Sequence, residues 1–335
     1  AAKRETTKQF SAQRVAAVTN SFEYIADRWL ANRSAAGKRS LKHDVGRLKN
    51  YVYPSWGARD ISTITRRDVF TLLEDVQARV IKDRGYGIGV NANRVGSLIK
   101  SIFAFALDRE VITTNPASGV KPLVAEQARK LELSSEQTRA AFRATRGISD
   151  PRLRDYFTLL WLTGARCGEI AKSRWQDVDF NASVLRIPKE NTKGKVNWSI
   201  PLSEPAMVVL RARKSSASGE LVFDGPRPLN NLNHYWKRLV KDPSGVELRL
   251  HDIRSLAVSQ MARWQVPEIL LDIVLGHSVG KSIVAKNYLS YRFEAEHRVA
   301  LSRWARWLND EQAELTAGAI AALVVRTQEQ QPKQP

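Results

Sequence analysis

The sequence predicts a mainly α-helical fold with one small β-hairpin, an α+β chain in two domains. Three observations favour this class. Apolar residues recur three and four positions apart along most of the chain, which is typical of amphipathic helices. Residues 184–202 instead alternate apolar and polar side chains around a polar turn, as a hairpin does. The stretch 115–122, with two prolines and a glycine, interrupts the helical pattern and indicates a domain boundary.

The first domain is expected at residues 21–115. Phe22, Ile25 and Trp29 begin its first helix at helical spacing, and Ser21 is a plausible N-cap. Three more helical patterns follow, at 41–52, 66–80 and 91–109. Residues 1–20 are polar and aperiodic, so we expect a linker or the remnant of an upstream segment there.

The second domain is expected at residues 133–314, after an interdomain linker at 116–132. Helices are predicted from Ser134 or Ser135 to Arg146 and from Arg152 to Leu162, followed by the hairpin with Lys193 near its tip. Helical patterns dominate again up to Glu314. Residues 315–335 form a tail, and its apolar part, 317–325, could dock onto a neighbouring protomer or pack on its own domain.

The high positive charge of the chain indicates which kind of partner it binds. A formal net charge of +19 and a pI near 10.2 require a polyanion, and nucleic acid is favoured over an acidic membrane because the basic residues are dispersed. No apolar run reaches the roughly 18 residues needed to span a bilayer. The single cysteine, Cys167, excludes an internal disulfide and a four-cysteine zinc site, so we expect a cytoplasmic protein, associated with the nucleoid.

Three short motifs could carry chemistry. Arg166, in TGARCGEI, lies at a loop-to-helix junction where an anion could bind, although pairing with Glu169 or Asp177 is an equally good explanation. In HDIR, His251 and Arg254 have the i, i+3 spacing of neighbours on a helix. In LGH, His277 follows a glycine suited to a helix C-cap. A histidine in such a place is more often structural than catalytic.

Taken in order, these motifs resemble the signature of the tyrosine recombinase (phage integrase) family. The resemblance extends from Ser21 to Leu308, because the four-helix part is similar to the family's core-binding domain and the remainder to its catalytic domain. A basic, Trp-containing helix at 298–308 also fits. The catalytic set that the resemblance implies is Arg166, Lys193, His251, Arg254, His277 and Tyr288.

Tyr291 is the competing nucleophile, three residues after Tyr288. We prefer Tyr288 because its distance from Arg298 and Trp304 resembles that in integrases of phages and genomic islands. The chain departs from the family at Ser173, where leucine is common, and at 255–256, where Ser-Leu replaces Arg-Thr. These departures concern packing and family branch.

The resemblance implies a DNA strand transfer in which Tyr288 attacks a phosphodiester and Lys193 protonates the departing oxygen. The two arginines would neutralise the phosphate oxygens, His277 would donate to one of them, and His251 would assist deprotonation of the tyrosine. Because side chains meet the charge, we expect neither a metal nor a cofactor, and the sequence has no ligand cluster suited to Mg²⁺ or Zn²⁺.

For DNA binding, the helix at 91–109 offers a polar face with Asn93, Arg94, Ser97 and Lys100, although a merely solvated face is equally compatible. The expected function is site-specific recombination for integration or excision of a mobile element. A type IB topoisomerase or a non-catalytic DNA-binding protein on the same scaffold are the alternatives. Expected partners are double-stranded DNA with specific sites, further copies of the chain in a tetramer on two sites, and accessory DNA-bending proteins.

Overall fold

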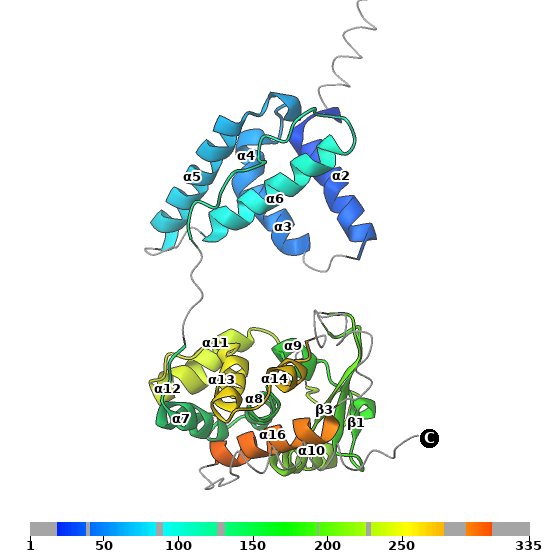
Figure 1. Ribbon diagram of the computed structural model, residues 1–335, viewed down its shortest axis with the longest axis vertical. Helices are drawn as coiled ribbons and strands as arrows, with labels where there is room; N and C mark the ends of the chain where they lie inside the picture. The colour runs from blue at the N-terminus through cyan, green and yellow to red at the C-terminus, as the bar shows by residue number, and fades with distance from the viewer. Residues whose placement is uncertain are drawn as a thin grey trace, which may run out of the picture. The chain divides into compact units, whose positions relative to one another are not determined.

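The computed structural model describes residues 19–37, 41–84, 90–125, 131–192, 194–225, 229–277 and 293–309 (Figure 1). The chain forms two compact units, residues 1–129 and 130–335. Helices dominate both, and the described strands form one small sheet in the second unit, which confirms the predicted fold class. No described helix is both long enough and apolar enough to cross a membrane.

The first unit is all-helical in its described part. Ser21 begins it as predicted, because its side chain accepts a hydrogen bond from the Tyr24 amide. Its elements are α2 (Phe22–Ala35), α3 (Leu41–Arg47), the π-helical η1 (Leu48–Val52), α4 (Tyr53–Trp56), the 3₁₀ turn η2 (Ile61–Thr63), α5 (Arg66–Arg84) and α6 (Val90–Leu107).

Three aromatic rings form the centre of this unit. Phe22, Trp56 and Phe103 contact one another edge to face, with ring centroids 5.5 to 6.2 Å apart, and all three are buried. Edge-to-face pairs add to the free energy gained by burying the rings. They join α2, α4 and α6, elements that are far apart in the sequence.

The chain after α6 also packs on this unit. Ala117 is buried in its core, and the Asn93 amide donates to the carbonyl of Val124 over 2.8 Å. The Arg66 guanidinium donates to the carbonyl of Gly119. The first part of the segment expected as a linker, 116–132, therefore lies against α5 and α6. Asn93, which we placed on a polar face, is instead buried.

The second unit is built around a small sheet and a set of helices. Its elements are α7 (Ser135–Arg146), α8 (Pro151–Thr163), α9 (Cys167–Ala171), η3 (Trp175–Asp177), β1 (Val178–Asp179), β2 (Val184–Ile187), β3 (Trp198–Pro201), α10 (Glu204–Ser215), α11 (Leu232–Trp236), η4 (Lys237–Lys241), α12 (Asp242–Ser244), α13 (Asp252–Arg263), α14 (Glu268–Val274) and α16 (Glu294–Leu308).

The sheet is antiparallel in the order β1-β2-β3. The predicted hairpin is β2–β3, in which Leu185 pairs with Ile200 and Ile187 pairs with Trp198. Leu185, Ile187 and Ile200 are buried, so alternation fixes which face meets the core. The sequence did not reveal β1, because two residues are too few to show a period.

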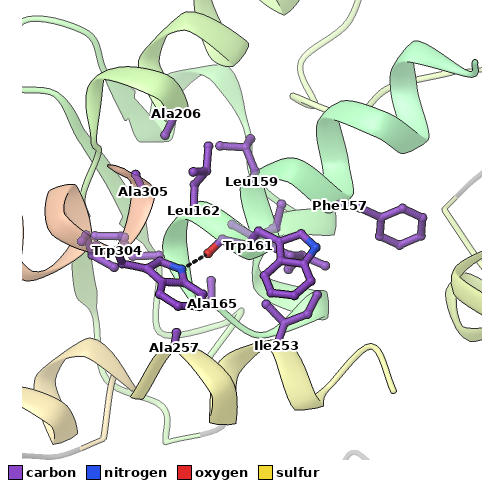
Figure 2. Packing of buried hydrophobic residues seen from close by; sticks show 14 of the residues in the cluster. Phe157, Leu159, Trp161, Leu162, Ala165, Ala206, Ile253, Ala257, Trp304 and Ala305 are labelled. Atoms are coloured by element: carbon purple, nitrogen blue, oxygen red, sulfur yellow. Dashed lines mark hydrogen bonds between the residues drawn. The ribbon is translucent and has the colours of Figure 1, made fainter. Parts of the chain in front are cut away.

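Helix α8 lies at the centre of the second unit. The indole N–H of Trp304 in α16 donates to the carbonyl of Trp161 over 2.6 Å (Figure 2). The indole N–H of Trp161 donates in turn to the Thr145 hydroxyl. Trp161 and Trp304 are fully buried. Helix α16 also contacts α13, α14 and β3. Residues 294–308, which follow the proposed nucleophile in sequence, are thus anchored in the core of their own unit.

A buried histidine in α16 gives this unit a pH-dependent stability. His297 is 2% exposed, Nε2 has no partner within the described ranges, and burial followed by the charge of Arg298 lowers its pKa to about 3. The unfolded chain binds this proton below about pH 6.5 and the folded chain only near pH 3, so the free energy of unfolding falls as pH drops through that window. From pH 7 to pH 5 the loss should be about 2 kcal/mol.

Urea unfolding of the full chain at both pH values measures this loss. His297→Gln should abolish the extra acid sensitivity, while His234→Gln, at an exposed position in α11, should leave it unchanged. Equal acid sensitivity in wild type and His297→Gln would contradict the assignment.

Candidate active site

Arg166 lies in the loop between α8 and α9. Helix α8 ends at Gly164, whose φ of 61° is in the left-handed region that favours glycine. Two residues later, Arg166 is the N-cap of α9, and its backbone N–H and its guanidinium donate to the two carboxylate oxygens of Glu169 over 2.9 and 2.8 Å. The ion pair that we considered for Arg166 is therefore present.

Glu169 is only 1% exposed, whereas the Arg166 side chain is 23% exposed. A carboxylate is rarely buried so deeply unless cations surround it. The partly exposed guanidinium retains N–H groups that can reach a ligand, because the carboxylate takes one of its five. Glu169 thus orients the Arg166 guanidinium, and its solvent-exposed side remains accessible to a ligand.

Arg254 connects two loops. It lies in α13 and is 6% exposed, and it donates through Nη1 to the carbonyl of Gly164 over 2.9 Å and through Nη2 to the carbonyl of Leu275. Burial, and after it the charge of Arg166, lower the pKa of Arg254 to about 10, so the guanidinium stays charged at neutral pH. Through the carbonyl of Gly164, Arg254 holds the loop that carries Arg166 two residues later.

His277 follows the turn that ends α14. Gly276 has a φ of 51°, and the His277 amide donates to the carbonyl of Asp272 over 2.9 Å. The Nδ1 atom of His277 lies 3.2 Å from the Asp272 carboxylate, and the side chain is 47% exposed. A carboxylate at one ring nitrogen fixes the ring and leaves Nε2 for a ligand.

His251 is exposed and directly precedes α13 as its N-cap, three residues before Arg254. Arg254 links the loop before α9 to the turn after α14. The structure therefore brings Arg166, Arg254 and His277 together through two short loops. Lys193, Tyr288 and Tyr291 lie outside the described residues.

The described residues around position 193 hold the hairpin end in place. The Thr192 hydroxyl donates to the carbonyl of Lys189 over 3.1 Å and accepts from the amide of Val196 over 3.1 Å. The side chain of Asn197 accepts from the Lys189 amide over 2.7 Å. Side chains thus continue the β2–β3 pairing beyond the last ladder pair, toward position 193.

Two supporting residues were missed from the sequence. The hydroxyl of Tyr156, which is buried in α8, donates to the carbonyl of Cys167 over 2.8 Å and fixes the first turn of α9. Burial raises the pKa of both Tyr156 and the Cys167 thiol above their ordinary values. Asp272 orients His277 from five residues away. Neither has a sequence signal, because an apolar-face tyrosine and a helical aspartate are ordinary.

On α6, Arg94, Ser97 and Lys100 are exposed. The Ser97 hydroxyl donates to the carbonyl of Asn93 over 3.0 Å. Ser97 and Lys100 also line a hollow of about 210 Å³ between α5, α6 and the segment 117–123. Among the described residues, no group of three His, Cys, Asp or Glu side chains is arranged to hold a metal ion.

Comparison with known proteins identifies matching families in both units. Residues 132–294 match the model of the phage integrase family, and residues 22–122 match that of the phage integrase central domain. The prophage integrase IntA of Escherichia coli K12 is 25% identical over 298 residues, 86% of this chain and 70% of IntA. The prophage integrase IntZ of the same strain is 27% identical over 61% of this chain and 50% of IntZ.

Solved structures share the fold. A lambda integrase dimer bound to a COC′ core site has a TM-score of 0.60, with 21% identity over 77% of this chain and 94% of the other. A lambda integrase tetramer bound to a Holliday junction has a TM-score of 0.62, with 20% identity over 78% and 79%. The Tn1549 transposon integrase with circular intermediate DNA has a TM-score of 0.62, with 17% identity over 82% and 98%.

Because Glu169 is buried, its removal should destabilise the folded chain strongly. Glu169→Ala removes the ion-pair partner of Arg166 and the negative charge that raises the pKa of buried Arg254, so the free energy of unfolding should fall by about 3 to 5 kcal/mol. Glu220→Ala is the matched control, since Glu220 is exposed and pairs with Arg174 at the same 2.8 Å, and it should cost about 1 kcal/mol or less. Chemical denaturation measures both.

Sulfate supplies the second readout. An anion that binds between the two guanidinium groups should raise the melting temperature of Glu169→Ala more than that of wild type or Glu220→Ala. Equal sulfate effects in all three proteins would show that the carboxylate does not balance a shared positive site.

Proposed function

The chain belongs to the phage integrase family of tyrosine recombinases, and from that premise we propose that it cleaves and rejoins DNA strands through a 3′-phosphotyrosyl intermediate on Tyr288. The reaction is site-specific recombination of a mobile element, by integration or excision. The observation that best supports the assigned chemistry is the buried Arg254, which links the loop bearing Arg166 to the turn bearing His277.

The proposed first step exchanges one ester for another. The phenol oxygen of Tyr288 bonds to phosphorus and gives up its proton with the help of His251, and the bond from phosphorus to the 5′ oxygen breaks. Lys193 gives the departing oxygen its proton. A 5′ hydroxyl of a second strand later attacks the phosphotyrosine, releases Tyr288 and restores a phosphodiester, so no external energy source is consumed.

The arginines and His277 stabilise the transition state in this proposal. Arg254 uses two of its five N–H groups on the carbonyls of Gly164 and Leu275, which leaves three for a phosphate. Arg166 and Arg254 would each donate to non-bridging oxygens, and His277 to one of them through Nε2. Removal of one such donor costs on the order of 10²- to 10³-fold in rate.

Two DNA-contacting domains are part of the proposal. Residues 21–115 would bind DNA through Arg94, Ser97 and Lys100, and residues 133–314 would carry the reaction. By analogy with the lambda integrase tetramer on a Holliday junction, four copies would assemble on two sites, with the tail 315–335 docking on a neighbour. Double-stranded DNA as substrate implies an association with the nucleoid, and bending proteins could assist assembly.

A nicked recombination site tests the nucleophile, because loss of a short strand after cleavage traps the covalent adduct. Wild type and Tyr291→Phe should both form an adduct that is resistant to denaturing gel conditions, and Tyr288→Phe should form none. Peptide mapping of the wild-type adduct should find the DNA on Tyr288. An adduct that persists in Tyr288→Phe would remove this assignment, and its absence from wild type would remove the proposed reaction.

The DNA-binding residues on α6 predict a salt dependence. Arg94→Gln and Lys100→Gln should each weaken binding and reduce the slope of log K against log[salt] by about 0.9, because each phosphate contact releases counterions. Arg109→Gln is the control, since the Arg109 guanidinium, in the turn after α6, is 3.5 Å from the centre of the Phe105 ring and donates to the Phe105 carbonyl. Slopes equal to that of wild type in both variants would exclude these phosphate contacts.

A further inference from the structure

We propose that Trp198 is a positioning residue that couples the lysine hairpin to the turn bearing His277. This inference rests on the proposed function, since it assigns Trp198 a part in aligning Lys193 with the phosphate. Trp198 is the first residue of β3 and lies five positions after Lys193. It touches no reacting group in the proposal.

The indole ring of Trp198 packs directly on Gly276. A Cβ atom added to Gly276 would lie 2.7 Å from Cδ2 and Cε2 of Trp198 and 2.9 Å from Cζ2, closer than any side chain can approach. Only a glycine fits against the ring, and the φ of 51° at Gly276 favours glycine independently. Contact with the ring therefore sets the distance between β3 and this backbone turn.

The two neighbours of Gly276 belong to the candidate site. The carbonyl of Leu275 accepts from the buried guanidinium of Arg254, and the amide of His277 donates to Asp272. These two contacts hold the turn without Trp198, so loss of the indole ring would free the hairpin and leave the turn in place. Through Trp198, the β-sheet touches this turn.

On its other side, Trp198 is fixed to the hairpin. Its backbone pairs with Ile187 in β2, and the adjacent Asn197 side chain accepts from the Lys189 amide. The ring and the hairpin end must then move together. A misplacement of about 1 Å can cost on the order of 10²-fold in rate. A contact that sets the distance between the hairpin and the His277 turn should therefore affect the reaction rate.

The contact between Trp198 and Gly276 depends on the flat shape of the ring and not on a hydrogen bond. The Nε1 atom of Trp198 is buried, and no described residue accepts its hydrogen bond. The described contacts of the ring with Gly276 are made by its carbon atoms and do not use the N–H group. A phenylalanine keeps a flat ring and lacks the N–H group, and it should preserve the coupling.

A pair of DNA substrates tests the role. One carries an ordinary scissile phosphate, and the other replaces the 5′ bridging oxygen with sulfur, which leaves without needing a proton. Trp198→Ala should slow adduct formation on the ordinary substrate on the order of 10²-fold and on the sulfur substrate only a few-fold, because proton delivery by Lys193 is the step it misaligns. Trp198→Phe should stay within a few-fold of wild type on both.

Trp175→Ala is the matched control. Trp175, the first residue of η3, also has a buried indole N–H without a described acceptor, and its ring stacks on Phe180, which follows β1. Its loss should lower the melting temperature and change the rates on both substrates by the same factor. Equal slowing of both substrates by Trp198→Ala would make Trp198 merely structural and overturn the inference.

Gly276→Ala perturbs the same contact from the turn, and its rates on the two substrates test the inference even if Trp198→Ala does not fold. It should slow the ordinary substrate more than the sulfur substrate. In the Trp198→Ala background it should add less than it does alone, because the clash is gone and only the strain of the positive φ remains. Fully additive effects, or a Trp198→Phe variant as slow as Trp198→Ala, would overturn the inference. Failure of wild type to form an adduct on either substrate would instead overturn the proposed function.

Discussion

The candidate site depends on one buried guanidinium. Arg254 is the point at which α13 holds the carbonyl of Gly164, at the end of α8, and the carbonyl of Leu275, at the end of α14. Each carbonyl belongs to a chain segment that turns sharply at a glycine, and each segment places a cationic or titratable side chain two residues later. Without this bridge, Arg166 and His277 would sit on two independent loops.

A buried cation needs nearby negative charge, and Glu169 supplies it. Its carboxylate is almost inaccessible to solvent, receives two hydrogen bonds from Arg166 and raises the pKa of Arg254 against the effect of burial. One carboxylate against two guanidinium groups leaves a net positive site. The charged groups of such a site are already in place before an anion binds. They can therefore stabilise a developing negative charge without rearranging during the reaction.

Much of the fold could be predicted from the sequence, because amphipathic helices and an alternating hairpin leave a period that can be counted. The first unit followed its apolar spacing closely from Phe22 to Leu107. Packing contacts and hydrogen bonds between residues far apart in the sequence could not be predicted in this way. The contact of Trp198 with Gly276 joins positions 78 residues apart, and the hydroxyl of Tyr156 reaches a backbone carbonyl, so neither leaves a local pattern. Asn93 was misplaced for the same reason, since its partner Val124 lies 31 residues away.

The central claim is that Arg166, Arg254 and His277 neutralise one phosphate. The most direct measurement compares adduct formation on an ordinary DNA site with that on a site whose scissile phosphate is a neutral methylphosphonate, for wild type, Arg166→Ala and Arg254→Ala. Each arginine variant should lose far more activity on the charged phosphate than on the neutral one, because the neutral group needs no cation. An equal loss on both substrates would contradict charge neutralisation by this cluster.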